Sequence, residues 1–328
     1  MRTCLRTLKR VGQFTLAAAA MAAYLPAAVA NGFPDHAIRI VVPSSPGGSG
    51  DTVARLVAER MGKTLGQSVV VENRGGAGGN IATSLVAGAS PDGYTILLTG
   101  NNHTVNVSLF KDPPYKLSDF APVIQLTLGP TVFVASKSAP FQSLAELISA
   151  ANAEPETIVY GSPGIGLPSQ IAAVLFEQTA GVKLVHAPYK GSGPSLTSAL
   201  GGQIPLVAST LAAAMPYIKG GQLTGLAVTS EERWPSLPDI PTVAESGYPG
   251  FSHLTWLGLL APAGTPPAVL HKLHDAAQSA LDDPDLRKQF EEMGTNAVGG
   301  SAAGFQKMMD QDYEASKALI QRSSLKAE

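Results

Sequence analysis

"IRIVVPSSPGGSGDTVARLVAERM", residues 38–61, decides the fold class of this 328-residue chain. It opens with a β-branched apolar run typical of a buried strand, and residues 52–65 place apolar side chains at helical spacing. Between them lies a corner rich in glycine and serine, residues 43–51. Glycine permits positive φ and close approach of a ligand, and the first turn of a helix offers free N–H groups. The stretch therefore predicts a strand–corner–helix unit that can hold an anion.

The same alternation continues along the chain, with helical patterns between most of the apolar runs. The expected strands are 38–42, 69–72, 94–99, 132–135, 158–161, 183–187, 204–209 and 223–228. The expected helices are 52–65, 143–153, 169–180, 194–200, 267–281, 284–293 and 301–323. This order predicts an α/β fold with a doubly wound, mainly parallel sheet, in which ligands bind beyond the carboxyl ends of the strands. The proline-rich stretch 236–250 is a candidate crossing between two domains.

Residues 1–30 are predicted to be a secretory signal peptide. Basic residues precede the apolar segment "FTLAAAAMAAYL", and small residues lead to an expected cleavage after Ala30. Cleavage there would leave a net charge of about −6 and would remove Cys4, the single cysteine. An acidic chain without a thiol argues against nucleic-acid binding and against cysteine chemistry. We expect a periplasmic protein, and a monomer.

Two further corners follow predicted strands, "GSPGIGLPSQ" at 161–170 and "YKGSGPS" at 189–195. Both add hydroxyl groups and glycines, and a tight turn without a ligand is the alternative for each. Nucleotide signatures do not fit: the third glycine of G-x-G-x-x-G is replaced by Val53, Ile81 or Ser169, and no P-loop or G-x-S-x-G motif occurs. The corners therefore favour a small anion over a nucleotide.

Catalytic and metal-binding constellations are weak. The six histidines are scattered, and no set of side chains at ligand spacing indicates a metal or another cofactor. His103 follows a predicted strand end and could reach a ligand, although a turn histidine that bonds locally is equally plausible. No pair of residues suggests acid–base catalysis.

Several long stretches carry a resemblance to one family. They are "FPDHAIRIVVPSSPGGSGDTVARLVAERM", "VVVENRGGAGGNIATSLVAGASPDGYTILL", "YGSPGIGLPSQIAAVLFEQTAGV", "HAPYKGSGPSLTSALGGQIPL", "LTGLAVTSEERWPSLPDIPTVAESGYPGF" and "WLGLLAPAGTPPAVLHKL". In order and spacing the chain after residue 30 resembles the periplasmic solute receptors of tripartite tricarboxylate transporters, often called Bug receptors.

The resemblance implies a fold and a ligand class. The fold would be a two-lobed, hinge-closing binding protein (a Venus flytrap, type II-like) with a sheet in each lobe and two crossings between the lobes. Lobe 1 would comprise residues 31–130 plus 253–328, and lobe 2 residues 131–252. The ligand would be a small organic acid, a di- or tricarboxylate or an aromatic carboxylate, taken up or sensed without catalysis. The membrane subunits of a transporter would be its partners.

The resemblance also implies site residues. The candidates are Ser44, Ser45, Gly47, Gly48, Asp51, Asn101, Asn102, Ser162, Gly164, Gly166, Gln170, Lys190, Gly191, Ser192 and Ser209. Two of them depart from the family pattern, because Gln170 stands where a histidine is frequent and Ser209 where an aspartate is frequent. Without that aspartate the site lacks a counter-charge for an ammonium group, which favours a plain carboxylic acid over an amino acid. The alternative for Ser209 is an ordinary hydroxyl at a strand end.

Two other functions stay open on the sequence. One is a periplasmic hydrolase or isomerase that acts on a carboxylate substrate through Ser45 or His103. The other is a chaperone or interaction module with a protein partner.

Overall fold

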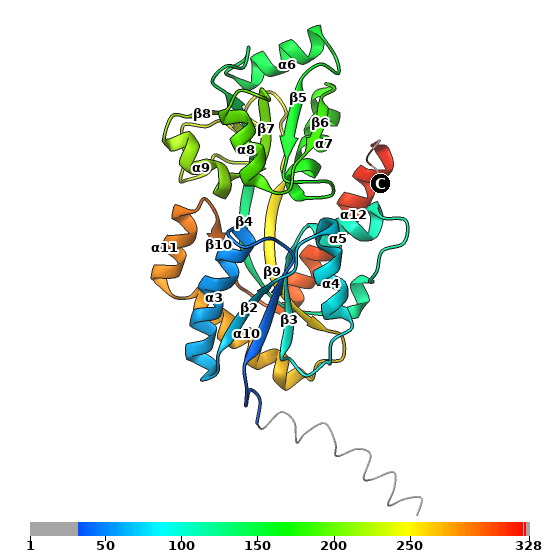
Figure 1. Ribbon diagram of the computed structural model, residues 1–328, viewed down its shortest axis with the longest axis vertical. Coiled ribbons are helices and arrows are strands. Elements are labelled where there is room, and N and C mark those ends of the chain that lie inside the picture. The colour runs from blue at the N-terminus through cyan, green and yellow to red at the C-terminus, as the bar shows by residue number, and fades with distance from the viewer. Residues whose placement is uncertain (1–31, 324, 326–328) are drawn as a thin grey trace, which may run out of the picture.

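The computed structural model describes residues 32–323 and residue 325, and Figure 1 shows two halves joined by long strands. The predicted signal peptide lies outside the described residues. The elements in chain order are β1 (Ile38–Val42), α3 (Ser49–Leu65), β2 (Val69–Asn73), η1 (Ala77–Gly79), α4 (Asn80–Ala87), β3 (Thr95–Gly100), α5 (Asn102–Leu109), η2 (Leu117–Asp119), β4 (Phe120–Ser136), α6 (Leu144–Ala153), β5 (Val159–Ser162), α7 (Pro168–Ala180), β6 (Val185–Pro188), α8 (Ser192–Leu200), β7 (Leu206–Thr210), α9 (Leu211–Lys219), β8 (Leu223–Val228), β9 (Leu254–Pro262), α10 (Pro267–Leu281), α11 (Pro284–Glu292), β10 (Asn296–Ala297) and α12 (Ala302–Arg322).

Strand β4 belongs to both halves. The strand order is β2-β1-β3-β9-β4-β7-β5-β6, and β8 and β10 also pair with β4. Residues 120–130 of β4 pair with β9, whereas residues 131–136 pair with β7 and β8. We call β1–β3, β9, β10 and their helices α3–α5 and α10–α12 the lower half, and β5–β8 with α6–α9 the upper half, following Figure 1.

The sheet is mixed, which corrects the expectation of a mainly parallel one. Strand β1 runs parallel to β2 and β3, and β5 runs parallel to β6 and β7. Strands β4 and β9 are antiparallel to each other and to their other partners. The chain passes upward on β4 and returns on β9, so the strands that join the halves must run in opposite directions.

Alternating side chains of each strand fill cores on both faces of the sheet. In β1, Ile38, Ile40 and Val42 pack with helices α3 and α10, whereas Val41 faces the cluster that contains Trp256. The upper half repeats this arrangement around the last part of β4. Successive residues of a strand point to opposite faces, so a strand covered by helices on both faces is apolar at most of its positions.

The two halves also touch beside the crossing strands. Val105 and Leu109 of α5 and Leu319 of α12 form one buried apolar cluster with Ile171 of α7. On the other flank, Gly294 lies against α9, where an added Cβ would be 2.3 Å from Met215 Cε. The halves therefore meet on both flanks of the crossing strands.

Several elements were not expected from the sequence. They are β9, the first part of β4, and helices α4, α5 and α9. The stretch 236–250 is not the crossing: Val228 N donates to Pro241 O at 2.9 Å and Val243 N to Val228 O at 3.0 Å, so it lies beside β8. The return to the lower half is made by β9, which pairs with β4 along its whole length.

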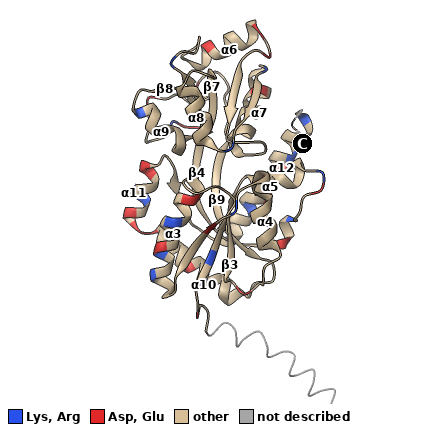
Figure 2. Cartoon of the chain, viewed as in Figure 1, with Lys and Arg blue, Asp and Glu red and all other residues tan. Residues whose placement is uncertain are grey.

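Charged residues are scattered over the outer helices, without one dominant sign (Figure 2). Within the part of the chain that the structure describes, no helix combines the length and the apolar character that crossing a membrane would require.

Asp312 attaches the C-terminal helix to the lower half. Its carboxylate accepts hydrogen bonds from Asn101 Nδ2 at 3.0 Å and Trp256 Nε1 at 3.2 Å, and a further one from Thr104 Oγ1. Burial raises the pKa of Asp312, and the hydrogen bonds from Thr104, Trp256 and Asn101 act against that rise. Helix α12 is thus held by one acceptor group that faces three donors.

We expect Asp312→Asn to lower the free energy of unfolding by about 2–4 kcal/mol, because an amide NH2 group would face donors at a largely buried site. Asp310→Asn is the matched control, since Asp310 is exposed on the same helix and its carboxylate accepts a hydrogen bond from Gln306. Urea unfolding of both variants measures the difference. Equal losses would contradict this role for Asp312.

Candidate functional site

The first corner, between β1 and α3, is held by Asp51. Gly47 has a φ of 82°, and its N–H donates to Asp51 Oδ2 at 2.9 Å. Arg55 lies 2.9 Å from the other carboxylate oxygen. Burial acts to raise the pKa of Asp51, but the hydrogen bonds from Arg55 and from the Gly47 amide hold it below its usual range. Asp51 is therefore ionised and used by its own loop rather than offered to a ligand.

The second corner, between β5 and α7, has the same construction. Gly166 has a φ of 74°, and its N–H donates to Gln170 Oε1, four residues on, at 2.7 Å. Leu167 N approaches Gly164 O at 3.4 Å, as Gly48 N approaches Ser45 O at 3.4 Å in the first corner. Each half therefore presents one glycine turn locked by a side chain in the first turn of the following helix.

A hydrogen-bonded network of side chains lies behind the second corner. Gln170 Nε2 is 3.0 Å from His186 Nδ1, and His186 Nε2 is 2.7 Å from Ser162 Oγ. Ser162 Oγ in turn lies 3.2 Å from Gly164 N, which donates to it. Burial lowers the pKa of His186 to about 4. Ser162 and Gln170 are thus structural partners of the corner, and His186 belongs with them although no local sequence pattern indicates it.

The third corner is attached to the second. Gly191 N donates to Pro163 O at 2.8 Å, and Gly191 has a φ of 114°. Ser192 begins α8, and Lys190 is exposed. Gly164, at a φ of 150°, is so close to this corner that an added Cβ would lie 3.3 Å from Tyr189 O. The two corners form one surface of the upper half.

Asn101 and Asn102, which were predicted to contact a ligand, make hydrogen bonds within the protein. Asn101 donates to Leu254 O at 3.2 Å and to Asp312, and accepts from Trp256 N at 3.0 Å. Asn102 Nδ2 donates to Gly78 O at 3.1 Å. The amide of Asn101 and the NH2 group of Asn102 are thus used within the protein.

His103 does not reach the cleft. It is 1% exposed and packs between the rings of Tyr115 and Phe120, at centroid distances of 5.1 and 4.8 Å. Burial lowers the pKa of His103 to about 3. It is a neutral core histidine.

The glycine-rich loop at residues 75–79 brings the first two corners together, a feature that sequence analysis missed. An added Cβ on Gly75 would lie 3.4 Å from Ser45 N in the first corner. On Gly78 it would lie 3.6 Å from Ile165 O, in the second corner, and 3.5 Å from Asn106 Nδ2. "RGGAGG" was a visible signal, because repeated glycine marks places where backbones approach closely.

Buried polar atoms without a partner among the described residues occur in both halves. In the lower half they include Ser44 Oγ, Asn106 Oδ1 and Thr255 Oγ1, and in the upper half Ser169 Oγ, Ser209 Oγ and Thr210 Oγ1. Ser209 is fully buried at the end of β7. Buried polar groups are nearly always hydrogen-bonded, so unpartnered ones mark places where a ligand or water can bind.

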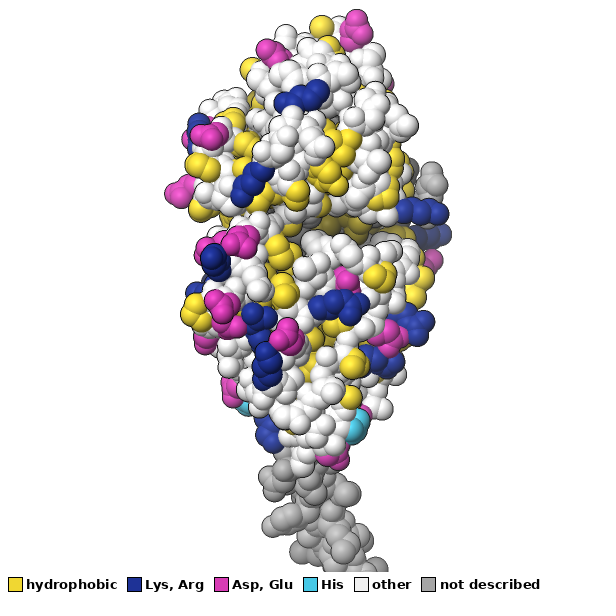
Figure 3. Space-filling view, turned by 60° about the vertical axis from the view of Figure 1, so that its left-hand side comes forward, with side chains coloured by type: hydrophobic (Ala, Val, Ile, Leu, Met, Phe, Trp, Pro, Cys, Tyr) yellow, Lys and Arg dark blue, Asp and Glu magenta, His cyan; other side chains and the backbone are white. Residues whose placement is uncertain are grey.

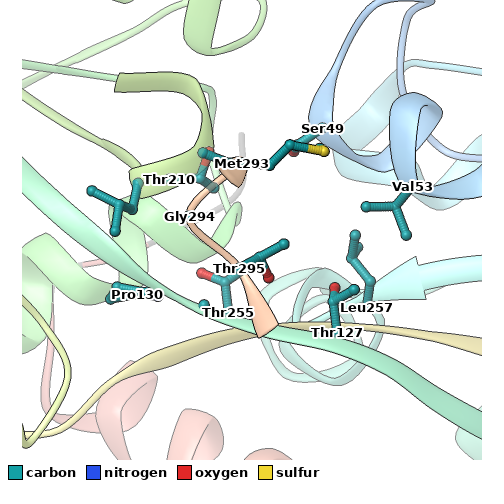
Figure 4. Close-up of a pocket in the computed structure, with 13 residues that line it drawn as sticks. Ser49, Val53, Thr127, Pro130, Thr210, Thr255, Leu257, Met293, Gly294 and Thr295 are labelled. Atoms are coloured by element: carbon teal, nitrogen blue, oxygen red, sulfur yellow. The ribbon is translucent and has the colours of Figure 1, made fainter. Parts of the chain in front are cut away.

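A small cavity of about 50 Å³ lies between the halves (Figure 4). Ser49 and Val53 of α3 line it from the lower half, Thr210 and Leu211 from the upper half, and Thr255 from the crossing strand β9. Figure 3 shows a hollow with hydrophobic side chains at the junction of the halves. Ligand pockets usually measure about 300–1,000 Å³, so the halves stand close together here.

Comparison with known proteins identifies the family. Residues 53–325 match the family described as "Tripartite tricarboxylate transporter family receptor". The chain belongs to this family. It is a family of binding proteins and not of enzymes, so the alternative of a hydrolase that uses Ser45 or His103 is not supported.

Solved structures confirm the α/β periplasmic binding protein fold. The receptor resembles periplasmic binding protein BugD, with 35% identity and a TM-score of 0.83 over 90% of this chain and 100% of the other. It resembles R. palustris Rpa4515 with adipate, at 34% identity and a TM-score of 0.84 over 88% and 97% of the chains. It also resembles MatC of Rhodopseudomonas palustris with bound malate, at 32% identity and a TM-score of 0.82 over 88% of this chain and 100% of the other.

We expect Gly166→Ala to destabilise the receptor more than Gly47→Ala. Both replace a glycine with positive φ, which costs about 1–2 kcal/mol. An added Cβ on Gly47 has no neighbour within 4 Å, whereas one on Gly166 would lie 2.7 Å from Leu109 Cδ2 of the lower half. Urea unfolding compares the two variants, and equal losses would mean that Leu109 gives way without cost.

We expect the free energy of unfolding to fall as the pH drops from about 6.5 toward about 4. Burial lowers the pKa of His253, like that of His186, to about 4, so the unfolded chain binds protons in this window that the folded chain does not. Stability is thus fully present above the unfolded pKa and is lost as the pH falls, by up to about 1.4 kcal/mol per pH unit for each neutral histidine. Urea titrations at several pH values measure the slope, and His253→Asn should reduce it. A flat profile would contradict the buried neutral state.

Proposed function

We propose that the receptor is periplasmic and binds a small organic acid, a di- or tricarboxylate or an aromatic carboxylate, between its halves for uptake or sensing. Family membership supports this proposal, as do two relatives, Rpa4515 with adipate and MatC with bound malate. The observation that carries it is the meeting of two glycine corners, one from each half, around the loop at residues 75–79.

The chemistry would be that of neutral donors. The first turns of α3 and α8 offer backbone N–H groups, and Ser45 and Ser192 add hydroxyl groups. The N–H groups of Gly48, Gly164 and Gly191 are bonded within the corners and shape them. Hydrogen bonds to a charged group contribute about 1.5–3 kcal/mol each, and a micromolar ligand needs about 8 kcal/mol. A handful of such contacts therefore suffices without an arginine. Ser209 supplies no counter-charge for an ammonium group, which favours a plain acid.

The halves would act as two lobes that close like a hinge. Lobe 1 would be residues 31–130 plus 253–328, lobe 2 residues 131–252, and β4 and β9 the two crossings. Hinge closure around a ligand is the usual motion of periplasmic binding proteins. The small cavity supports a closed arrangement, in which admission of a ligand requires the lobes to separate.

Export and partners complete the proposal. The signal peptide of residues 1–30 would be cleaved after Ala30 and leave a monomer in the periplasm. The membrane subunits of a tripartite tricarboxylate transporter would be its partners, and no nucleic acid is expected.

We expect malate, adipate or another acid of this class to raise the melting temperature. A ligand at a hundred times its dissociation constant stabilises the folded state by about 2.7 kcal/mol. Thermal unfolding with a panel of carboxylates, and with glutamate as an amino acid for comparison, measures the shift. A protein stripped of ligand by refolding that responds to none of them would refute the proposal.

Thr210→Val tests the cleft itself, because Thr210 Oγ1 is buried without a partner at the cavity wall. We expect an acid identified by the panel to bind about three- to tenfold more weakly, with little loss of stability. Thr197→Val, at an exposed position on α8, is the control and should bind normally. Titration calorimetry measures both, and normal binding by Thr210→Val would exclude this hydroxyl from the site.

A further inference from the structure

We infer that His186, in its neutral form, is the positioning residue of the second corner, and that protonation of its ring releases the corner and weakens binding of an acid there. This inference rests on the proposed function for its effect on binding, but the network itself stands on geometry alone. The His186 ring joins two arms that end on Gly166 and on Gly164.

The direction of every hydrogen bond in the network follows from its first member. Gly166 N–H can only donate, so Gln170 Oε1 is the acceptor, at 2.7 Å. The NH2 group of Gln170 therefore faces His186 Nδ1 at 3.0 Å, and that nitrogen must be unprotonated. The ring proton then lies on Nε2 and is donated to Ser162 Oγ at 2.7 Å.

The second arm ends on the other glycine of the corner. Ser162 Oγ accepts from His186 and from Gly164 N at 3.2 Å, and its own proton points toward Gly164 O at 3.3 Å. A hydroxyl has one donor and two acceptor positions, so Ser162 is fully used. Ser162 is 0% and Gln170 4% exposed, so water does not readily replace these bonds.

A second proton on the ring conflicts with this order. Imidazolium has two N–H donors, and its Nδ1–H would face the NH2 group of Gln170. If the Gln170 amide flipped, its oxygen could accept from the protonated Nδ1, but its NH2 group would then face the N–H of Gly166, and two donors cannot form a hydrogen bond. One hydrogen bond of the corner is lost in either arrangement.

The surroundings of the ring favour the neutral form. Tyr160 of β5 packs against it with ring centroids 4.9 Å apart, and burial raises the pKa of Tyr160, so its hydroxyl is neutral. Glu177 of α7 accepts from Leu184 N at 2.7 Å, and burial raises its pKa. Lys183, which pairs with Glu156, and Lys190, which is exposed, are the cations near it in the chain. Burial is the one cause of the lowered pKa of His186, to about 4.

NMR of the histidine side chains tests the network without any ligand. The signals of His186 are assigned by their absence from His186→Asn. We expect the Nε2–H tautomer and a titration midpoint near 4. An Nδ1–H tautomer, or a midpoint in the ordinary range of about 6.5, would overturn the inference.

Gln170→Glu is a sharper variant, because a carboxylate can accept both from Gly166 N–H and from a protonated Nδ1. We expect the titration midpoint of His186 to rise well above that of the unchanged protein. An unchanged midpoint would show that residue 170 does not set the protonation state of the ring.

Amide hydrogen exchange tests positioning, again without ligand. We expect Gly166 N–H to exchange about tenfold faster in His186→Asn at neutral pH, since its acceptor is no longer oriented. His271→Asn is the control, because His271 is exposed on α10. Equal exchange in the two variants would mean that His186 does not hold the corner.

Binding separates this inference from the proposed function. With malate as the probe, we expect His186→Asn to bind about three- to tenfold more weakly at pH 7.5, and the difference in affinity from the unchanged protein to narrow at pH 4, where about half of the His186 rings are protonated. His271→Asn should bind normally at both values. If His186→Asn binds malate as tightly as the unchanged protein, or if the difference in affinity is the same at both pH values, the proposed effect on binding is refuted. Should the unchanged protein bind no acid at all, the proposed function fails, while NMR and exchange still decide the network.

Discussion

Strand β4 is the constraint on which the arrangement of the receptor depends. Its first eleven residues lie in the sheet of the lower half and its last six in that of the upper half, so one continuous ladder of hydrogen bonds runs through both. Strand β9 returns beside it, and register shifts between Pro122 and Ile124 and between Gln125 and Thr127 mark bulges in the pair. A bulge bends and twists a strand. The crossing is therefore ordered, yet it contains local irregularities where bending is easiest.

Given this crossing, the positions of the corners follow from the sheet. Strand β1 ends at Val42 and β5 at Ser162, and the helix after each begins within a few residues. In each corner a glycine with positive φ turns the chain, and a side chain four residues on accepts its N–H. The accepting side chain is charged in the lower half, where Asp51 is paired with Arg55. It is neutral in the upper half, where Gln170 is hydrogen-bonded to His186. The same turn is thus stabilised by an ion pair on one side of the cleft and by a protonation-dependent chain on the other.

Local patterns predicted much of the fold, whereas long-range pairing hid the rest. Residues 38–65 could be read correctly because a strand, a glycine corner and an amphipathic helix each have a short-range signature. The first part of β4 was missed because Pro122 and Pro130 argue against a central strand. Helix α5 was missed because "NNHTVNVSL" is polar in sequence although its amides are buried. The amides of Asn102 and Asn106 bond Gly78, and Asn101 accepts from Trp256 N, contacts between distant parts of the chain that no local pattern indicates. His186 and Gln170 lie on different elements, 16 residues apart, and no spacing rule joins them.

The first two corners would offer an anion only neutral hydrogen-bond donors. The described cations near the first corner are already paired, Arg55 with Asp51 and Arg74 with Glu72, and the chain as a whole is acidic. Long-range attraction would therefore contribute little to capture, because steering requires a field of the opposite sign. Affinity would have to come from short hydrogen bonds formed when the halves approach, and these strengthen as water is excluded. In such a site the exact placement of each N–H group matters more than net charge. A corner whose geometry depends on one neutral imidazole is then a sensitive point of the whole receptor.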